Sequence, residues 1–310
     1  LKEEIIESYK KLSQKYNQEN CDVAVRSSAT AEDLPTASFA GQQETFLNVH
    51  SNDNLLHAIK KCIASLFTDR AIVYRIENKF DHFKVALSVG VQKMVRSDLA
   101  CSGVAFSLDT ESGFSDVIEI TSSYGLGESI VQGIVNPDEF YVHKKTLELN
   151  FKPIIKKYLG NKETKIVYAK EHTQTLEVDK TDKQKFSLSD SEILELSKIV
   201  LKIENYYSNL KKSWSPMDIE WAKDGLDNKI YIVQARPETI HSQDKHDKLV
   251  RYNLTSKISE KDILLTGLSV GQKIAYGKVK IIKSIKDASN FESGDILVTA
   301  MTDPDWVPLM

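Results

Sequence analysis

The sequence has 310 residues, of which 41% are hydrophobic and 27% charged, and its formal net charge is −3. This composition is typical of a globular protein. The slightly acidic balance argues against a nucleic-acid partner, because phosphate backbones are bound by basic surfaces. No apolar run is long enough to span a bilayer, and the charged first residues do not resemble a signal peptide. The three cysteines lack metal-ligand spacing. We therefore expect reduced thiols, a cytoplasmic location and no membrane partner.

The ends of the sequence indicate a fragment. It begins with Leu1 rather than methionine and stops at Met310, directly after an apolar segment. A chain of this length holds one full domain and part of another.

Hydrophobic periodicity predicts the elements of the first half. Apolar residues three and four positions apart predict helices over 1–17 and 54–75. Between them we expect a strand at 22–28 and a loop over 30–45, which is polar and contains Gly and Pro. Alternation from Val85 to Val91 predicts a half-buried strand. Further strands are expected at 102–107, 117–122, 139–143, 153–157 and 165–168.

The second half contains the clearest helix, predicted over 190–208. Ser189 and Glu192 fit a capping box, in which each residue satisfies a free N–H group at the helix start. The apolar segments 217–222 and 229–235 flank a Gly-containing loop and predict a hairpin. Short strands around Gly277 and Gly294 predict a second structural unit. Because helices and strands mix without a steady βαβ alternation, we expect an α+β fold.

The predicted hairpin is the most informative segment for function. Residues two apart in a strand share a face, so Asp218 and Glu220 point one way and Ile219 and Trp221 the other. If Glu220 pairs with Gln234, the same register pairs Asp218 with Arg236. Oxygen ligands from this face suit Mg²⁺, and an arginine suits phosphate oxygens. We expect Tyr231 and Val233 to pack elsewhere with Ile219 and Trp221. The simpler alternative is a surface hairpin with one Asp–Arg ion pair.

Other candidate residues carry weaker signals. Arg26 lies near a strand end, beside small hydroxyl residues that allow a phosphate to approach, although a structural ion pair with Glu32 or Asp33 is the simpler interpretation. No P-loop motif is present. The backbone around Gln92, Met94 and Val95 leaves an apolar strand and could meet an adenine edge, or these residues could be ordinary core. Glu119 and Glu128 could each bind a ribose or a metal, but an isolated glutamate is usually solvated.

Several sequence blocks, in the same order, resemble one family. Residues 23–49, 64–75, 91–113, 122–144 and 218–239 resemble the ATP-binding domain shared by phosphoenolpyruvate synthases, pyruvate phosphate dikinases and related dikinases. The resemblance covers almost the whole chain. It implies an ATP-grasp fold over residues 1–240, a linker over 241–265 and the first strands of a swivelling phosphohistidine domain over 266–310.

This order of segments is that of the phosphoenolpyruvate synthases. In the similar antibiotic (rifampicin) phosphotransferases, which are the alternative, a drug-binding domain intervenes. The family reaction converts ATP, pyruvate and water to AMP, phosphoenolpyruvate and phosphate through a phosphohistidine, and it serves pyruvate metabolism and gluconeogenesis. The resemblance implies pyruvate and the phosphohistidine domain as partners. The oligomeric state stays open, with a homodimer of the full-length enzyme among the alternatives.

The resemblance also implies roles for individual residues. Arg26 and Arg236 would stabilise phosphate charge, and Glu220 and Gln234 would hold Mg²⁺ with Asp218 beside them. ATP would contact all five of these residues. The backbone of Gln92, Met94 and Val95 would meet its adenine, and Glu128 would lie near its ribose. On this basis Arg26 and the hairpin face are interpreted as functional, and Glu119 remains undecided.

Two features of the family have no counterpart in this sequence. One is an N-terminal Gly-rich segment whose lysine reaches ATP, and the other is the catalytic histidine after a Thr-Cys pair, which we expect beyond residue 310. A hypothesis of another class is therefore a nucleotide-binding module without turnover. A regulatory domain that has lost ATP binding is disfavoured, because Arg26, Glu220, Gln234 and Arg236 are all present.

Overall fold

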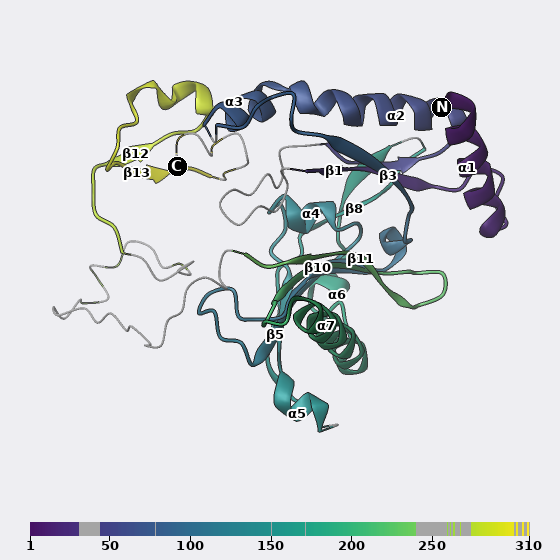
Figure 1. Ribbon diagram of the computed structural model, residues 1–310. Helices are drawn as coiled ribbons and strands as arrows, with labels where there is room; N and C mark the ends of the chain where they lie inside the picture. Colours follow the sequence, from purple (N-terminus) through teal and green to yellow (C-terminus); the bar gives the residue numbers. More distant parts are fainter. Residues whose placement is uncertain are drawn as a thin grey trace.

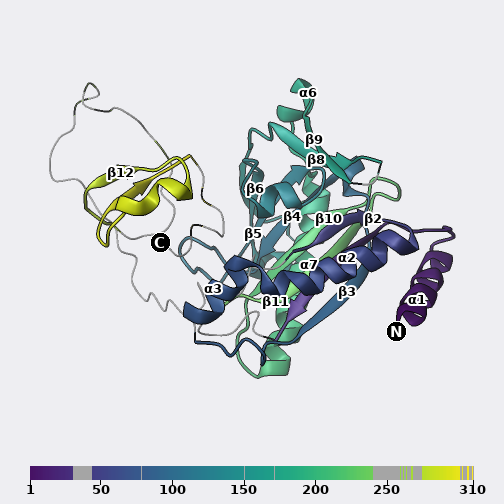
Figure 2. The same cartoon turned by 90° about the horizontal axis from the view of Figure 1, so that it is seen from above.

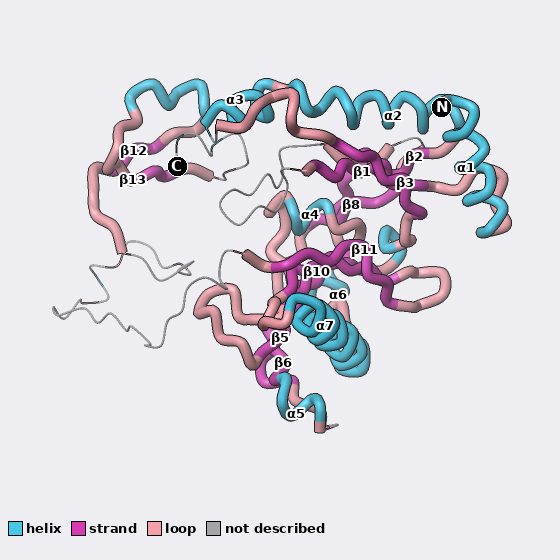
Figure 3. The backbone as a smooth tube through the Cα atoms, in the orientation of Figure 1, coloured by secondary structure: helices cyan, strands magenta, loops and turns pink. Residues whose placement is uncertain are grey.

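The computed structural model describes residues 1–30, 44–77, 79–149, 151–170, 172–239 and 274–300, with isolated positions between 259 and 309. Two sheets lie one above the other, each with helices on its outer side (Figures 1 and 3). The mixture of helices and mainly antiparallel strands confirms the predicted α+β class. Most of the predicted linker, 241–265, lies outside the described residues.

The helices lie mainly on the outer sides of the sheets. Their bounds are α1 (Lys2–Lys15), α2 (Asn52–Ala64), η1 (Ser65–Phe67), α3 (Asp69–Glu77), η2 (Ser97–Leu99), α4 (Glu128–Val131), α5 (Lys144–Glu148), α6 (Lys180–Lys183), α7 (Asp190–Lys211) and η5 (Ile285–Asn290).

Within the described residues the strands form four sheets, with orders β2-β1-β3, β11-β10-β4-β5-β6-β7, β8-β9 and β12-β13. Their bounds are β1 (Val23–Ala29), β2 (Phe46–Val49), β3 (Leu87–Lys93), β4 (Cys101–Phe106), β5 (Val117–Tyr124), β6 (Asp138–His143), β7 (Ile154–Tyr158), β8 (Thr164–Tyr168), β9 (Thr173–Glu177), β10 (Met217–Lys223), β11 (Ile230–Pro237), β12 (Val279–Ile281) and β13 (Ile296–Val298).

The upper, three-stranded sheet packs one face on α1 and α2, and α2 passes over it in Figure 2. Val23 and Val25 of β1 are fully buried in this cluster with Leu55 of α2. Because side chains alternate along a strand, Ala24 and Arg26 point to the opposite face. That face is the one turned toward the lower sheet, since Arg26 bonds to residues of β10 and β11.

The lower, six-stranded sheet packs its far face on α7 (Figure 1). Ile193, Leu196 and Val200 of α7 are fully buried against the sheet. The capping box is confirmed, because Ser189 Oγ accepts from Glu192 N and Glu192 Oε2 accepts from Ser189 N at 2.8 Å.

The helix predicted over 54–75 is divided into α2, η1 and α3. The break occurs at Thr68, whose backbone is extended with φ −69° and ψ 155°. Its hydroxyl donates to Ser65 O at 3.0 Å, and its carbonyl accepts from Ile72 N in the first turn of α3. A threonine that offers its side chain to nearby backbone groups favours helix ends over helix interiors, which periodicity alone does not register.

The three cysteines are free thiols and all are buried. Burial raises the pKa of Cys101 to about 12, so this thiol stays protonated and unreactive. Among the helices of the described ranges, none has the length and apolarity needed to cross a membrane.

A buried ion pair fixes β6 to the loop that follows β7. Lys162 Nζ lies 2.5 Å from Asp138 Oδ1, and both side chains are fully buried. The second carboxylate oxygen accepts from Ser187 N at 2.8 Å and Ser187 Oγ at 2.7 Å, and Oδ1 also accepts from Gly160 N. The charge is therefore fully compensated, and the network holds the start of the α7 segment to the sheet.

We predict that Asp138→Ala lowers the free energy of unfolding by about 3–5 kcal/mol, because it leaves the Lys162 ammonium buried without a partner. The matched control is Asp116→Ala, which removes the partner of the largely exposed Lys145 and should cost less than about 1 kcal/mol. Urea unfolding followed by circular dichroism measures both. Equal losses in the two variants would contradict the assignment of a buried pair.

Candidate functional site

At its polar end the hairpin of β10 and β11 has the register supposed from the sequence. Glu220 pairs with Gln234, and Asp218 pairs with Arg236. Arg236 Nε donates to Asp218 Oδ2 at 2.8 Å. Met217, Ile219 and Trp221 are buried in the core against α7, so Asp218 and Glu220 point to the face turned toward the upper sheet.

A β-bulge corrects the prediction for the returning strand. The register shifts between Glu220 and Trp221, which pairs with Ile232 instead of Val233. Ile230 and Ile232 therefore pack against the core, while Tyr231 and Val233 do not belong to that cluster. An extra residue in one strand reverses the faces beyond it, and alternation read from sequence contains no such step. The carbonyl of Val233 accepts from Gln92 Nε2 at 3.2 Å, which ties β11 to β3 of the upper sheet.

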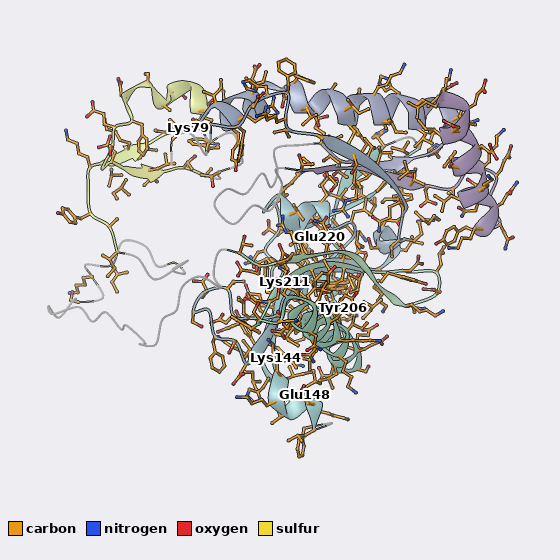
Figure 4. All side chains as sticks on the ribbon, viewed as in Figure 1. Lys79, Lys144, Glu148, Tyr206, Lys211 and Glu220 are labelled. Atoms are coloured by element: carbon orange, nitrogen blue, oxygen red, sulfur yellow. The ribbon has the colours of Figure 1, made fainter. Side chains whose placement is uncertain are left out.

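Arg26 bridges the two sheets at this face. Its Nη2 donates to Glu220 Oε2 at 2.7 Å and also to Gln234 Oε1. The Arg26 and Glu220 side chains are 21% and 32% exposed, so solvent reaches the pair. In Figure 4 Glu220 lies between the two sheets. Glu32 and Asp33, the partners considered from sequence, lie outside the described residues, and the ion pair that the structure places here joins Arg26 to Glu220.

The oxygens of this site suit a hard cation. Glu220 Oε2 and Gln234 Oε1 converge on one positively charged nitrogen, so the guanidinium stands where these two oxygens can share a cation. Within the described ranges no three His, Cys, Asp or Glu side chains gather into a metal-binding group. A Mg²⁺ ion held here would complete its shell with oxygens from substrate phosphates and water, as Mg²⁺ sites usually do.

The segment after β3 carries the backbone groups predicted for an adenine edge. Met94 N donates to Asp22 O at 3.0 Å, and Met94 O accepts from Lys93 Nζ at 3.2 Å. Val95 O accepts from Ser97 N, whereas Val95 N makes no hydrogen bond to the described part of the chain. A free N–H beside a carbonyl can match the N1 acceptor and the 6-amino donor of an adenine ring. The Met94 side chain is only 8% exposed and packs with Ala24, as expected for a core filler.

Glu128 lies on a different element from the hairpin group. It is the first residue of α4, and its carboxylate accepts from Gln132 Nε2 at 3.0 Å. The turn before it needs glycine, because Gly125 has φ +87° and an added Cβ would lie 2.5 Å from Ile166 O. The structure therefore brings together Arg26, Gln92, Asp218, Glu220, Gln234 and Arg236, and places Glu128 on a separate element.

Glu119 is buried rather than solvated, so the expectation for an isolated glutamate is wrong here. Its Oε2 accepts from Thr110 N at 3.0 Å and from Thr110 Oγ1 at 2.8 Å, and its side chain shares a sheet row with Phe106 and Asp218. Burial raises the pKa of its carboxyl. The sequence signal was an acidic residue among the apolar residues of β5. It indicates a buried carboxylate, which needs hydrogen-bond partners.

Sequence reasoning missed the residues that join the segment after β3 to the upper sheet and to β8. Asp22, Lys93 and Tyr168 form one hydrogen-bonded group there. Tyr168 comes from β8, so it is 146 positions from Asp22 along the chain, and no local pattern relates the two.

Known proteins resemble this chain over its full length. The family described as "Pyruvate phosphate dikinase, AMP/ATP-binding domain" matches residues 1–255. The phosphoenolpyruvate synthases of Helicobacter pylori and Aquifex aeolicus are each 54% identical to the chain over its full length, and that of Escherichia coli is 51% identical. The chain spans 39%, 37% and 38% of these three relatives. The chain thus belongs to the pyruvate phosphate dikinase family of AMP/ATP-binding domains.

Proposed function

We propose that this chain is the ATP-binding and phosphoryl-donor part of a phosphoenolpyruvate synthase (pyruvate, water dikinase). The observation that carries the proposal is the convergence of Arg26, Glu220 and Gln234 between two sheets, in a chain that matches phosphoenolpyruvate synthases over its full length. That match includes the region after residue 255, which favours a phosphoenolpyruvate synthase over an antibiotic phosphotransferase.

The proposed architecture is an ATP-grasp domain over 1–240, in which ATP lies between the two sheets. Residues 266–310 are proposed to begin the swivelling phosphohistidine domain. Its support is a separate small core, in which Ile282, Ala288 and Trp306 pack together and β12 pairs in parallel with β13.

Each residue of the site has a role set by its charge and position. Glu220 and Gln234 hold Mg²⁺ with Asp218 beside them, and the bound ion supplies positive charge to the phosphate oxygens. When ATP binds, the Arg236 guanidinium donates two hydrogen bonds to the transferring phosphate. Arg26 then exchanges its bonds to Glu220 and Gln234 for bonds to the triphosphate. Positioning and charge neutralisation of this kind account for most of the catalysis in phosphoryl transfer. The backbone at Val95 meets the adenine.

The whole reaction converts ATP, pyruvate and water to AMP, phosphoenolpyruvate and phosphate, with a histidine outside this chain as the first acceptor. This chain alone is therefore proposed to bind ATP without turning it over. An assay for AMP from ATP and pyruvate tests that statement. Sustained AMP production by the 310-residue chain would overturn it.

Glu220→Ala should weaken ATP binding in the presence of Mg²⁺ by at least about tenfold, the size of a lost contact to a charged group. Without Mg²⁺ the variant should bind ATP at least as tightly as the parent, because loss of Glu220 frees Arg26 for the triphosphate. Calorimetric titration with ATP, with and without Mg²⁺, measures this. Glu148→Ala is the matched control, since Glu148 lies on α5 at the far end from Glu220 (Figure 4). A parent chain that is folded but binds no ATP would contradict the proposed function.

Arg26→Met should have opposite effects on two ligands. Removal of the guanidinium frees Glu220 and Gln234, so Mn²⁺ should bind about fivefold more tightly in the absence of nucleotide, a size set by the strength of a part-exposed ion pair. ATP should bind more weakly, because a phosphate contact is lost. Paramagnetic resonance of free Mn²⁺ reports the first effect and calorimetry the second. Unchanged Mn²⁺ affinity would show that Arg26 does not compete for these oxygens.

Arg236→Ala in the full-length enzyme should lower kcat by about 10²–10³, as removal of one preorganised group at a developing charge does. ATP affinity should change less than kcat, because the contact strengthens in the transition state. Steady-state kinetics of phosphoenolpyruvate formation checks both values. An unchanged kcat would contradict the role assigned to Arg236.

A further inference from the structure

The chain passes between the two sheets through residues 93–96, and Asp22 holds the beginning of this segment. Asp22 precedes β1, and its carbonyl accepts from Met94 N at 3.0 Å. Its Oδ1 lies 2.5 Å from Lys93 Nζ, and its Oδ2 accepts from Tyr168 OH at 2.6 Å. One residue thus contacts the segment through its backbone and reaches across to β8 through its side chain.

The Asp22 carboxylate is nearly buried, with 15% of its side chain exposed. Burial by itself would raise its pKa, but hydrogen bonds from Lys93 and Tyr168 outweigh that effect, so the pKa is lowered. Burial and the neighbouring Asp22 raise the pKa of Tyr168. At neutral pH the aspartate is therefore ionised and the phenol is a permanent donor, which makes this hydrogen bond a charge-assisted one.

Arg96 holds the end of the segment. Its guanidinium lies 4.6 Å from the centre of the Tyr168 ring and donates to Asp98 at 2.8 and 2.9 Å. Its backbone N donates to Asp224 Oδ2 at 3.1 Å, and its carbonyl accepts from Gly225 N at 3.0 Å. Tyr168 thus contacts both ends, through its hydroxyl at Asp22 and through its ring at Arg96.

Between these two anchors lie Met94 and Val95. The Met94 carbonyl accepts from Lys93 Nζ, which Asp22 holds in place, and the Val95 N–H is free in the described part of the chain. A free donor recognises a ligand only if its backbone keeps one orientation before binding, because ordering it afterwards would reduce affinity.

We propose that Asp22, Lys93 and Tyr168 are positioning residues that hold the backbone of Met94 and Val95 ready for a nucleobase. They act at the base end of the nucleotide and do not touch phosphate. This inference rests on the proposed ATP-binding function. It assigns the group a part in nucleotide affinity in addition to its packing of β8 on the upper sheet.

Tyr168→Phe tests the proposal, since it removes the hydroxyl and keeps the ring beneath Arg96. Tyr231→Phe is the matched control, because that hydroxyl also donates to a carboxylate at 2.6 Å, that of Asp227 in the hairpin loop. Hydrogen exchange of the ligand-free 310-residue chain gives the first measurement. Exchange at the Met94 amide should rise at least about tenfold in Tyr168→Phe, the size of one lost bond to a charged group. Amides of β10 should stay as protected as in the parent and in the control.

Nucleotide affinity gives the second measurement. In Tyr168→Phe the Kd values of ATP, ADP and AMP should rise by one common factor of about tenfold, because all three share the base. Glu220→Ala should weaken ATP most, since its effect depends on the phosphates. A rise confined to ATP, or unchanged affinity for all three, would overturn the proposal.

Asp22→Asn and the double variant Asp22→Asn, Tyr168→Phe complete the test. The double variant should be no weaker than Asp22→Asn alone, because both changes act through one bond. Additive losses, or faster exchange throughout the chain, would mean a general loss of stability and would overturn the proposal. If the parent binds no nucleotide, the proposed function fails by itself. The exchange at Met94 then still decides whether this group positions the segment.

Discussion

The candidate site depends on one charge that crosses between two sheets. Arg26 belongs to the upper sheet, and its guanidinium bonds to Glu220 and Gln234 of the lower one. Those two side chains are brought together only by the register of β10 and β11. Opposite Arg26 in β3 stands Gly90, where an added Cβ would meet no atom closer than Arg26 O at 3.8 Å, so the face beside the arginine stays open. Part-exposed ion pairs are weak enough to exchange partners, which suits a site whose ligand brings its own charges.

In each sheet one face packs in an apolar core and the other carries the polar residues of the site. The upper sheet buries valines against α1 and α2, and the lower one buries Ile219 and Trp221 against α7. The polar side chains of the site lie on the two sheet faces that point toward each other. Hydrophobic burial, which contributes most to stability, therefore places few demands on the residues that would meet ATP. Substitutions in the site can change binding while the two cores remain intact.

Buried carboxylates fix the positions at which separate segments of the chain meet, which apolar packing alone does not. Asp138, Glu119 and Asp22 are each nearly or fully buried, and each carboxylate accepts hydrogen bonds from a loop or from a distant strand. A buried carboxylate is tolerated only where such partners are in place. These residues therefore fix where segments meet, and Asp22 does so at the passage between the sheets.

The features that depend on local periodicity could be predicted from the residues alone. Alternation along a strand fixes which side chains share a face, so Asp218 could be grouped with Glu220 and Gln234 with Arg236. The supposed pairing of Glu220 with Gln234 then implied that of Asp218 with Arg236, and both pairs occur. The capping box of α7 is equally local. The family followed from motif order, since several blocks in sequence are specific even where each is weak. The β-bulge in β11 was not predicted, because one inserted residue reverses the faces of the strand without changing the hydrophobic pattern.

Contacts between residues that are distant in sequence follow from the fold. Spacing alone offered Arg26 a neighbour in its own loop, whereas its partners in the structure are Glu220 and Gln234, 194 and 208 positions away. The same holds for Tyr168 and Asp22. Contacts of this length are set by how two sheets stack and by where the chain crosses between them, and a single sequence contains no periodicity that reports either. Local chemistry is therefore readable from the residues themselves, and the pairing of charges across the sheets is a property of the fold.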